Sequence, residues 1–148
     1  MEIVRIKEAK EPLLSKIIEL EEQAFEGNGN VDLWIIKALI RYGLVYILVE
    51  ENEVISIVEY MRYFDENSVF LYGISTIQNK RHKGYATKIM KYTEDVLKKT
   101  GIEKISLTVD PKNNIAIEMY KKFGYETVEF QKDEYGEGID RYLMIKKI

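Results

Sequence analysis

The apolar residues of this 148-residue chain change their spacing repeatedly, and that alternation limits the folds it can adopt. Apolar residues at every third or fourth position indicate helices, whereas alternating or continuous runs of β-branched residues indicate strands. The two kinds of segment follow one another without a repeat or a Pro-, Gly- or Ser-rich linker. A chain of this length buries roughly two-thirds of its unfolded surface in one core. We therefore expect one domain, residues 1–148.

The spacing predicts strands that alternate with helices along the chain. Asp32 is expected to cap the second helix, and Gly43, Gly101 and Gly124 to end helices. Together these segments describe a three-layer α/β fold with a mixed sheet. The strands are expected at 2–7, 44–49, 54–63, 69–76, 104–109, 126–131 and 139–148, and the helices at 13–24, 33–40, 86–97 and 114–123.

Composition excludes several kinds of chemistry. The chain has no cysteine, so disulfides, thiolate metal sites and an acyl-cysteine intermediate are excluded, and one histidine excludes a multi-histidine metal centre. A net charge of −3 gives no broad basic surface for nucleic acid. The longest apolar stretch, 33–49, is interrupted by Lys37 and Arg41 and is shorter than the roughly 20 residues of a membrane span. We expect an unprocessed cytoplasmic protein without a metal, nucleic-acid or membrane partner.

Small residues follow basic ones where the third predicted helix begins. Gly84 and Ala86 lie in its first turn, after Lys80, Arg81 and Lys83. Free backbone N–H groups and the partial positive charge of a helix start bind anions, and a glycine lets a phosphate approach. A loop glycine beside solvated lysines explains this segment equally well. The spacing matches neither the P-loop nor the dinucleotide-binding fingerprint.

Three segments in order resemble the signature of the GCN5-related N-acetyltransferases (GNAT), over about residues 69–125. The resemblance implies a GNAT-like α/β/α fold with a mostly antiparallel sheet of about six or seven strands and about four helices. It also implies an acetyl-CoA-dependent N-acetyltransferase that uses no metal. The segments are Ile74-Ser75-Thr76, then Arg81-x-x-Gly84-x-Ala86, then Asn113-x-x-Ala116-x-x-x-Tyr120-x-x-x-Gly124-Tyr125.

The resemblance also implies roles for individual residues. The backbone from Arg81 to Thr87 would hold the pyrophosphate of acetyl-CoA, and 74–76 would pair with its pantetheine arm and polarise the thioester carbonyl. His82 is expected to contact the cofactor rather than act as a base. The full set of expected cofactor-binding residues is Ile74, Ser75, Thr76, Arg81, His82, Lys83, Gly84, Tyr85, Ala86, Thr87, Asn113 and Tyr120.

Tyr120 is the predicted general acid. Asn113 lies two helical turns before it, so both side chains are expected to face one groove beside the sheet. The resemblance implies that Asn113 contacts pantetheine and that Tyr120 donates a proton to the departing thiolate. With eleven tyrosines in the chain, a packing role for Tyr120 is the alternative, but the match of the neighbouring residues favours catalysis.

A protonated amine has a pKa of about 10, so its attack on a thioester requires a base or a water chain. Glu59 is the acidic residue within the apolar strand 54–63 and is the predicted base. An outward-facing surface position is at least equally open for it. The strand 69–76 has no Asp or Glu, so a family arrangement with its base there is absent. Tyr72, or a water held by main-chain carbonyls, is the other candidate.

The acceptor is expected to be an amine of a small molecule or peptide. In the family, the first two helices form one wall of the acceptor site, which makes Glu22, Phe25, the loop 27–30 and Trp34 candidates, although core or surface roles are equally open. The acidic composition slightly favours a cationic acceptor. A homodimer formed through exposed sheet edges is also open. The alternative functions are a catalytically silent acyl-CoA sensor and, less favoured, an RNA-binding domain using 80–83.

Overall fold

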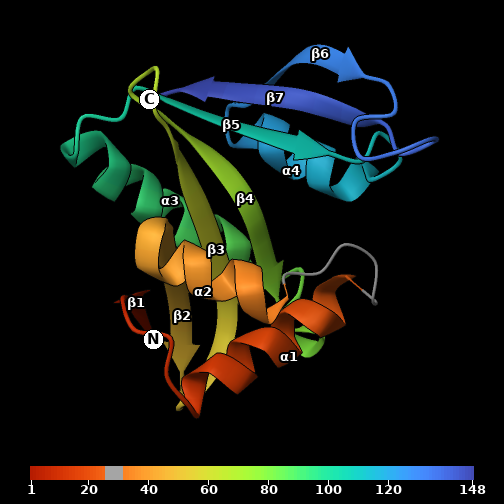
Figure 1. Ribbon diagram of the computed structural model, residues 1–148. Helices are drawn as coiled ribbons and strands as arrows, with labels where there is room; N and C mark the ends of the chain where they lie inside the picture. Colours follow the sequence, from red (N-terminus) through yellow and green to blue (C-terminus); the bar gives the residue numbers. More distant parts are fainter. Residues whose placement is uncertain (26–31) are drawn as a thin grey trace.

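The computed structural model describes residues 1–25 and 32–148, which form a seven-stranded sheet (Figure 1). The strand order is β1-β2-β3-β4-β5-β7-β6, and every neighbouring pair is antiparallel except β4–β5. The prediction of a mixed, mostly antiparallel sheet is therefore confirmed. The strands are β1 Glu2–Ile6, β2 Leu44–Glu50, β3 Glu53–Tyr63, β4 Ser68–Thr76, β5 Lys104–Val109, β6 Glu126–Gln131 and β7 Arg141–Lys147.

Helices cover both faces of the sheet, which confirms the three-layer prediction (Figure 1). One core cluster joins α1 and α2 to the sheet, and the other joins α3 and α4 to the opposite face. A short 3-10 helix, Gln78–Lys80, leads from β4 towards α3. The α-helices are α1 Leu13–Phe25, α2 Leu33–Tyr42, α3 Tyr85–Lys99 and α4 Asn114–Lys122.

Most element boundaries lie within two residues of the expected ones. Asp32 caps α2 by accepting a hydrogen bond from the Ile35 amide (3.0 Å). The last strand is expected from about 139, and β7 begins two residues later, at Arg141. Ile139 belongs instead to the preceding turn, where its amide donates to the Gly136 carbonyl (2.9 Å). The turn uses the backbone groups that a longer strand would need.

The long helix α3 buries the face that its apolar spacing predicts. Ile89, Met90, Thr93 and Leu97 are all buried against the sheet. The Thr93 hydroxyl is 2.8 Å from the hydroxyl of Tyr60 on β3, so the polar atoms in this layer have partners. Burying one large apolar side chain contributes about 1.5–3 kcal/mol. This packing fixes the start of α3 relative to the end of β4.

β4 and β5 separate along their length, and this separation creates the space for a site. The two strands pair only through Ser68–Phe70 and then diverge, as Figure 1 shows. From Leu71 onward the edge of β4 that faces β5 is therefore unpaired. A β-bulge also interrupts the pairing of β4 with β3, because Glu59 lies opposite Gly73 and Tyr60 opposite Leu71. Tyr72 is the extra residue, and bulges commonly adjoin functional sites.

Candidate active site

The start of α3 has the backbone geometry of an anion site. Gly84 precedes the helix in the left-handed conformation (φ 83°), and no side chain caps the first amides. A Cβ at this position would meet nothing within 4 Å, so the space above the glycine is open. The first N–H groups of a helix lack internal partners and point out of its end. The expected anion-binding backbone is present, and its ligand stays a prediction.

Several side chains of this loop have partners within the protein. Arg81 Nε donates to the Thr76 carbonyl (3.1 Å), which fastens the loop to the end of β4. The Tyr85 hydroxyl donates to Glu50 Oε2 (2.7 Å), which raises the pKa of Tyr85 and lowers that of Glu50. The Tyr85 side chain is thus directed to β2. His82, Lys83 and Thr87 are exposed. The groups of 81–87 that remain available for the predicted cofactor contacts are therefore backbone amides and these exposed side chains.

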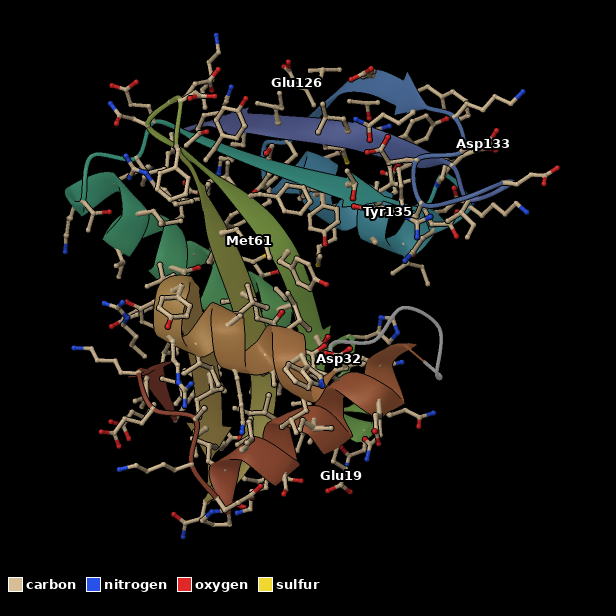
Figure 2. The ribbon with its side chains drawn as sticks, viewed as in Figure 1. Glu19, Asp32, Met61, Glu126, Asp133 and Tyr135 are labelled. Carbon is tan, nitrogen blue, oxygen red and sulfur yellow. The ribbon has the colours of Figure 1, made fainter. Side chains whose placement is uncertain are left out.

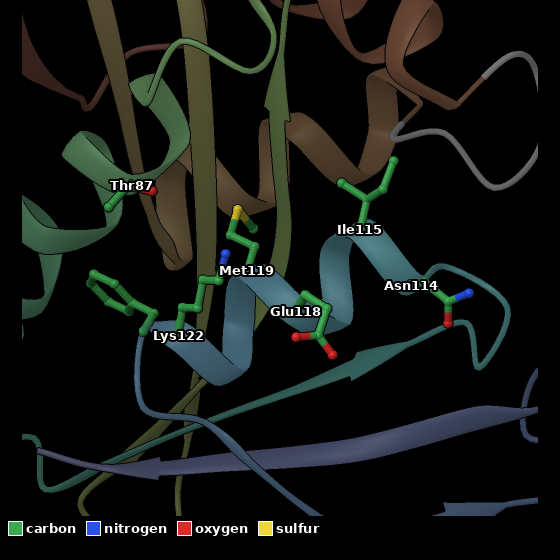
Figure 3. A pocket seen from close by; sticks show the side chains of 7 residues that line it. Thr87, Asn114, Ile115, Glu118, Met119 and Lys122 are labelled. Atoms are coloured by element: carbon green, nitrogen blue, oxygen red, sulfur yellow. The ribbon is translucent and has the colours of Figure 1, made fainter.

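A groove of about 550 Å³ begins beside this loop, between the first turn of α3 and the length of α4 (Figure 3). Its wall combines apolar side chains with two charged ones, Glu118 and Lys122. The α4 residues of this wall are not among the predicted site residues, although they recur at helical spacing from 115 onward. The lining residues are Thr87, Asn114, Ile115, Glu118, Met119, Lys122 and Phe123.

Asn113 and Tyr120 differ in burial, and a groove shared by their side chains stays a prediction. Asn113 is the N-cap of α4 rather than a residue within it, and its Oδ1 accepts from the Ala116 amide (3.1 Å). Its side chain is exposed, whereas Tyr120 is only 7% exposed and packs edge-on against Tyr125. Neither Asn113 nor Tyr120 is among the side chains that line the groove beside α4.

Tyr120 retains the properties of a proton donor. Burial raises its pKa to about 12, so the hydroxyl stays protonated at neutral pH. No hydrogen bond within the described residues holds this hydroxyl. A packing tyrosine and a general acid are both consistent with this burial, and the catalytic role stays a prediction.

The end of β4 presents its backbone, because its side chains are engaged. Ser75 is buried, and its carbonyl accepts from Ser56 Oγ (2.8 Å). Thr76 Oγ1 lies 3.0 Å from the same Ser56 hydroxyl, and Ile74 packs into the core on the α3 side. The segment 74–76 can therefore contact a ligand through the backbone groups of its unpaired edge. This arrangement suits the backbone pairing that the family resemblance implies.

Glu59 is fully buried, so the surface position considered for it is wrong. It lies opposite Gly73 at the bulge of β4. A Cβ on Gly73 would come within 2.7 Å of Glu59 Oε2, so the absence of a side chain at 73 makes room for the carboxyl group. When Glu59 and its neighbour Glu21 are both ionised, neither oxygen of Glu59 has a hydrogen-bond donor. Burial, followed by the hydrogen bond and charge of Glu21, raises the pKa of Glu59 well above its usual value.

Glu21 on α1 is a site residue that sequence reasoning missed. It is fully buried, and its Oε2 accepts from Ser75 Oγ (3.3 Å). Burial raises the pKa of Glu21, and the hydrogen bonds from Glu59 and Ser75 oppose that rise. A signal was present, because Leu14, Ile17 and Glu21 follow helical spacing and all three are buried. An acidic residue in that stripe indicates a buried carboxyl group.

Other polar groups gather around the bulge. The pKa of Tyr72 is raised by partial burial and by the nearby Glu59, Tyr135, Asp32 and Glu21. Asp32 starts α2, and Tyr135 lies in the turn between β6 and β7 (Figure 2). Tyr72 therefore lies near the exposed Asp32, Tyr135 and the two buried carboxyl groups, a set of acidic and aromatic groups that favours a cation.

The predicted acceptor residues differ in what the structure says of them. Glu22 is exposed on α1, next to the buried Glu21, and Trp34 is 85% exposed on α2. The side chain of Phe25 and the loop 27–30 lie outside the described residues. Glu22 and Trp34 are therefore not gathered with Glu59, and acceptor binding by them stays a prediction.

Within 1–25 and 32–148, no three His, Cys, Asp or Glu side chains are grouped so that they can bind a metal ion. The helices of these two ranges are also too short or too polar to cross a membrane.

Comparison with known proteins decides the family. A family model described as the acetyltransferase (GNAT) family matches residues 14–125. The chain belongs to the GNAT acetyltransferase family. The resemblance seen in its motifs is thereby confirmed.

Two curated GNAT relatives are named N-alpha-acetyltransferase. The one from Sulfurisphaera tokodaii is 31% identical over 73 residues, which is 49% of this chain and 44% of the relative. The one from Saccharolobus solfataricus is 31% identical over 77 residues, 51% of this chain and 46% of the relative. The chain thus matches less than half the length of each of these relatives.

Solved GNAT structures share the whole fold. The ribosomal-protein-S18-alanine N-acetyltransferase from Escherichia coli has a TM-score of 0.83 at 15% identity, covering 99% of this chain and 94% of that one. An aminoglycoside 6'-acetyltransferase type Ii has a TM-score of 0.83 at 18% identity, covering 99% of this chain and 97% of that one. The PaiA N-acetyltransferase from Thermoplasma acidophilum, solved with coenzyme A, has a TM-score of 0.73 at 19% identity, covering 100% of both chains. These matches confirm the predicted fold.

Proposed function

We propose that this GNAT domain transfers the acetyl group of acetyl-CoA to a primary amine by direct attack in a ternary complex. The observation that carries the proposal is the open, left-handed Gly84 at the start of α3, beside a groove of about 550 Å³. No acylated residue is proposed, because the chain has no cysteine and no Ser–His pairing suggests itself around its single histidine.

The residues present fit acetyl-CoA. The amides after Gly84 would hold the pyrophosphate, with Lys83 adding positive charge. The unpaired edge of β4 would hold the pantetheine arm. When bound, acetyl-CoA supplies a thioester whose acetyl group can pass to an amine.

Glu59 and Tyr120 would move the protons. Glu59 accepts one proton from the acceptor ammonium, and because both of its oxygens are enclosed, a water molecule carries that proton to it. The neutral nitrogen then forms the new C–N bond as the C–S bond breaks. Tyr120 gives its hydroxyl proton to the sulfur and regains one from the nitrogen. The products are an amide, a thiol and one proton, which Glu59 later releases to solvent.

The acceptor site supports a cationic amine. Glu59, Glu21 and Asp32 surround the bulge of β4 together with Tyr72. An α-amino group loses its proton at a pKa of about 7.7–8.0, against about 10.4 for a lysine side chain, so a carboxylate deprotonates it more readily. The names of the two archaeal relatives support the same choice. We therefore propose a peptide α-amino group as the first acceptor to test.

The decisive experiment measures free thiol release with acetyl-CoA and a panel of peptide N-termini, polyamines, amino acids and aminoglycosides. Mass spectrometry then locates the added acetyl group. Acetyl-CoA at about 100 times its dissociation constant should also stabilise the fold by roughly 2.7 kcal/mol. Stabilisation without release for any amine would favour the silent acyl-CoA sensor. Absence of both would overturn the proposal.

Tyr120→Phe tests the proton donor. Removing the hydroxyl should lower kcat by about 10²-fold, the lower end of the range for general acid catalysis. The affinity for coenzyme A, measured by titration calorimetry, should stay nearly unchanged, because the ring still packs against Tyr125. Equal turnover in both proteins would assign Tyr120 to packing alone.

The setting of the reaction is also proposed. We infer a cytoplasmic enzyme and consider a homodimer formed through an exposed sheet edge. β6 ends the sheet, and its first five residues are exposed, so it is a candidate edge. Light scattering of the purified protein measures the oligomeric state.

A further inference from the structure

Two buried carboxyl groups from distant parts of the chain meet under the β4 bulge. Glu21 comes from α1 and Glu59 from β3, and neither side chain is exposed to solvent. They lie within hydrogen-bonding reach of each other. No ion pair involves either of them in the part of the chain that the structure describes. Two adjacent buried charges without a cation are unfavourable.

The hydrogen bonds of the pair are incomplete when both groups are ionised. Glu21 Oε1 and both oxygens of Glu59 then have no donor, and Ser75 Oγ serves only Glu21 Oε2. A carboxylate is an acceptor only, whereas a carboxylic acid also donates. One proton on Glu59, donated to Glu21, supplies a missing hydrogen bond and removes one of the two charges. The geometry therefore favours a singly protonated pair.

We infer that Glu21 and Glu59 share one proton, and that Glu21 is a positioning residue that sets how readily Glu59 accepts a proton from the acceptor amine. This inference rests on the proposed function. The negative charge of Glu21 makes Glu59 a stronger base, because it favours the protonated form of its neighbour. A base is most effective when its pKa lies near the working pH.

The proton balance is simple. With both carboxyls ionised, the acceptor ammonium loses one N–H proton, a water passes a proton on, and Glu59 takes it. The N–H bonding pair becomes the lone pair on nitrogen, and one O–H bond forms on Glu59. That proton is held between Glu59 and Glu21 until it leaves for solvent. No oxidant or further reactant is required.

The other titratable groups near Glu59 do not interfere with this titration. The pKa of Tyr72 on β4 is raised from its usual alkaline value by partial burial and by the charge of Glu59. Asp32, at the start of α2, is exposed. On β2 the residue opposite Glu59 is the apolar Val45. Glu21 is therefore the group whose charge acts most directly on Glu59.

Glu21→Gln tests the inference, with Glu19→Gln as its matched control. Glu19 lies on the same helix, is exposed and points away from the sheet (Figure 2). The kcat/KM of the natural protein should rise as Glu59 loses its proton. This rise forms the acidic limb of the pH profile of kcat/KM. In Glu21→Gln the acidic limb should move to lower pH by about one unit or more, because a like charge is removed. In Glu19→Gln it should not move. An unmoved limb in Glu21→Gln would overturn the inference.

A second measurement separates this inference from the proposed function. Thermal unfolding followed across pH reports proton binding whether or not any amine is acetylated. Because the pKa of Glu59 is raised on folding, its stabilising contribution is present at acidic pH and is lost as pH rises through the folded value. In Glu21→Gln that loss should be smaller and complete at lower pH, because the folded-state pKa of Glu59 is lowered while its unfolded value is unchanged. Superimposable curves would overturn the shared proton, whereas a shifted curve without acetylation would overturn only the proposed function.

Discussion

The two sides of β4 present different chemistry. On the α3–α4 side, the candidate ligand contacts are backbone groups, namely the helix start after Gly84 and the unpaired strand edge. On the α1–α2 side, the reactive groups are two side chains, Glu21 and Glu59, brought together from separate elements. Backbone groups are supplied by almost any sequence that keeps the fold. The paired carboxyls depend on two particular residues.

This difference indicates a division of roles. The backbone side is suited to hold an invariable ligand, because its geometry depends on the glycine and the helix start. The carboxyl side is suited to tune proton transfer, because burial and a neighbouring charge set its pKa. Substitutions that disturb the backbone groups of the first side should change binding, and substitutions of the carboxyl groups on the second should change turnover and its pH dependence. Tyr120 also packs on the α3–α4 side, and as the proposed proton donor it should affect turnover.

The largest expected effect is on the carboxyl side. Glu59→Gln keeps the shape of the side chain but removes its ability to accept the proton. General base catalysis contributes about 10²–10⁴-fold, so kcat/KM at neutral pH should fall by at least about 10²-fold. Initial-rate kinetics with the best acceptor of the panel measures this loss.

Coenzyme A binding is the control for Glu59→Gln. The dissociation constant from calorimetry should change little, because the backbone groups after Gly84 lie on the other side of β4. A loss of affinity equal to the loss of rate would contradict the division between the two sides. Full activity in Glu59→Gln would assign the base to a water or to Tyr72.

The same division explains what the sequence reveals. The Gly84 motif and the helix it begins are local, so a short stretch of sequence carries the backbone side, and the strand and helix order follows from periodicity. The pairing of Glu21 with Glu59 depends on how α1 packs across β3 and β4, which no short motif contains. Sequence reasoning therefore chose Glu22, one residue from the buried group. The helix predicted from 114 does begin at Asn114, because the start of a helix is also a local signal.

An intermediate effect is expected at the start of α3. Gly84 and Gly101 have nearly the same left-handed φ (83° and 85°), and a Cβ at either meets nothing within 4 Å. Alanine should therefore strain both backbones alike, by about 1–2 kcal/mol. Only Gly84→Ala should also place a methyl group where the pyrophosphate approaches. We expect about a tenfold weaker affinity for coenzyme A, or 1.4 kcal/mol.

Calorimetric titration of both glycine variants checks that expectation. Gly101→Ala should bind coenzyme A as the natural protein does, despite its similar loss of thermal stability. Equal weakening in both variants would attribute the effect to helix strain and remove Gly84 from the site.

The smallest expected effect joins the two sides, because Gly73 is a backbone position that makes room for a side chain. In Gly73→Ala the new methyl group would lie 2.7 Å from Glu59 Oε2, so the carboxyl group must move. A side chain pushed away from its preferred rotamer costs about 0.5–1.5 kcal/mol, and we expect kcat/KM to fall about threefold to fivefold.

Combining Gly73→Ala with Glu59→Gln provides the test, because the effects of residues that act through one group are not additive. If Gly73 acts by placing the carboxylate, the double variant should have nearly the rate of Glu59→Gln alone. A further threefold to fivefold loss in the double variant would mean instead that alanine at 73 disturbs the β4 backbone itself. Gly73 would then belong with the backbone groups and not with the carboxyl pair.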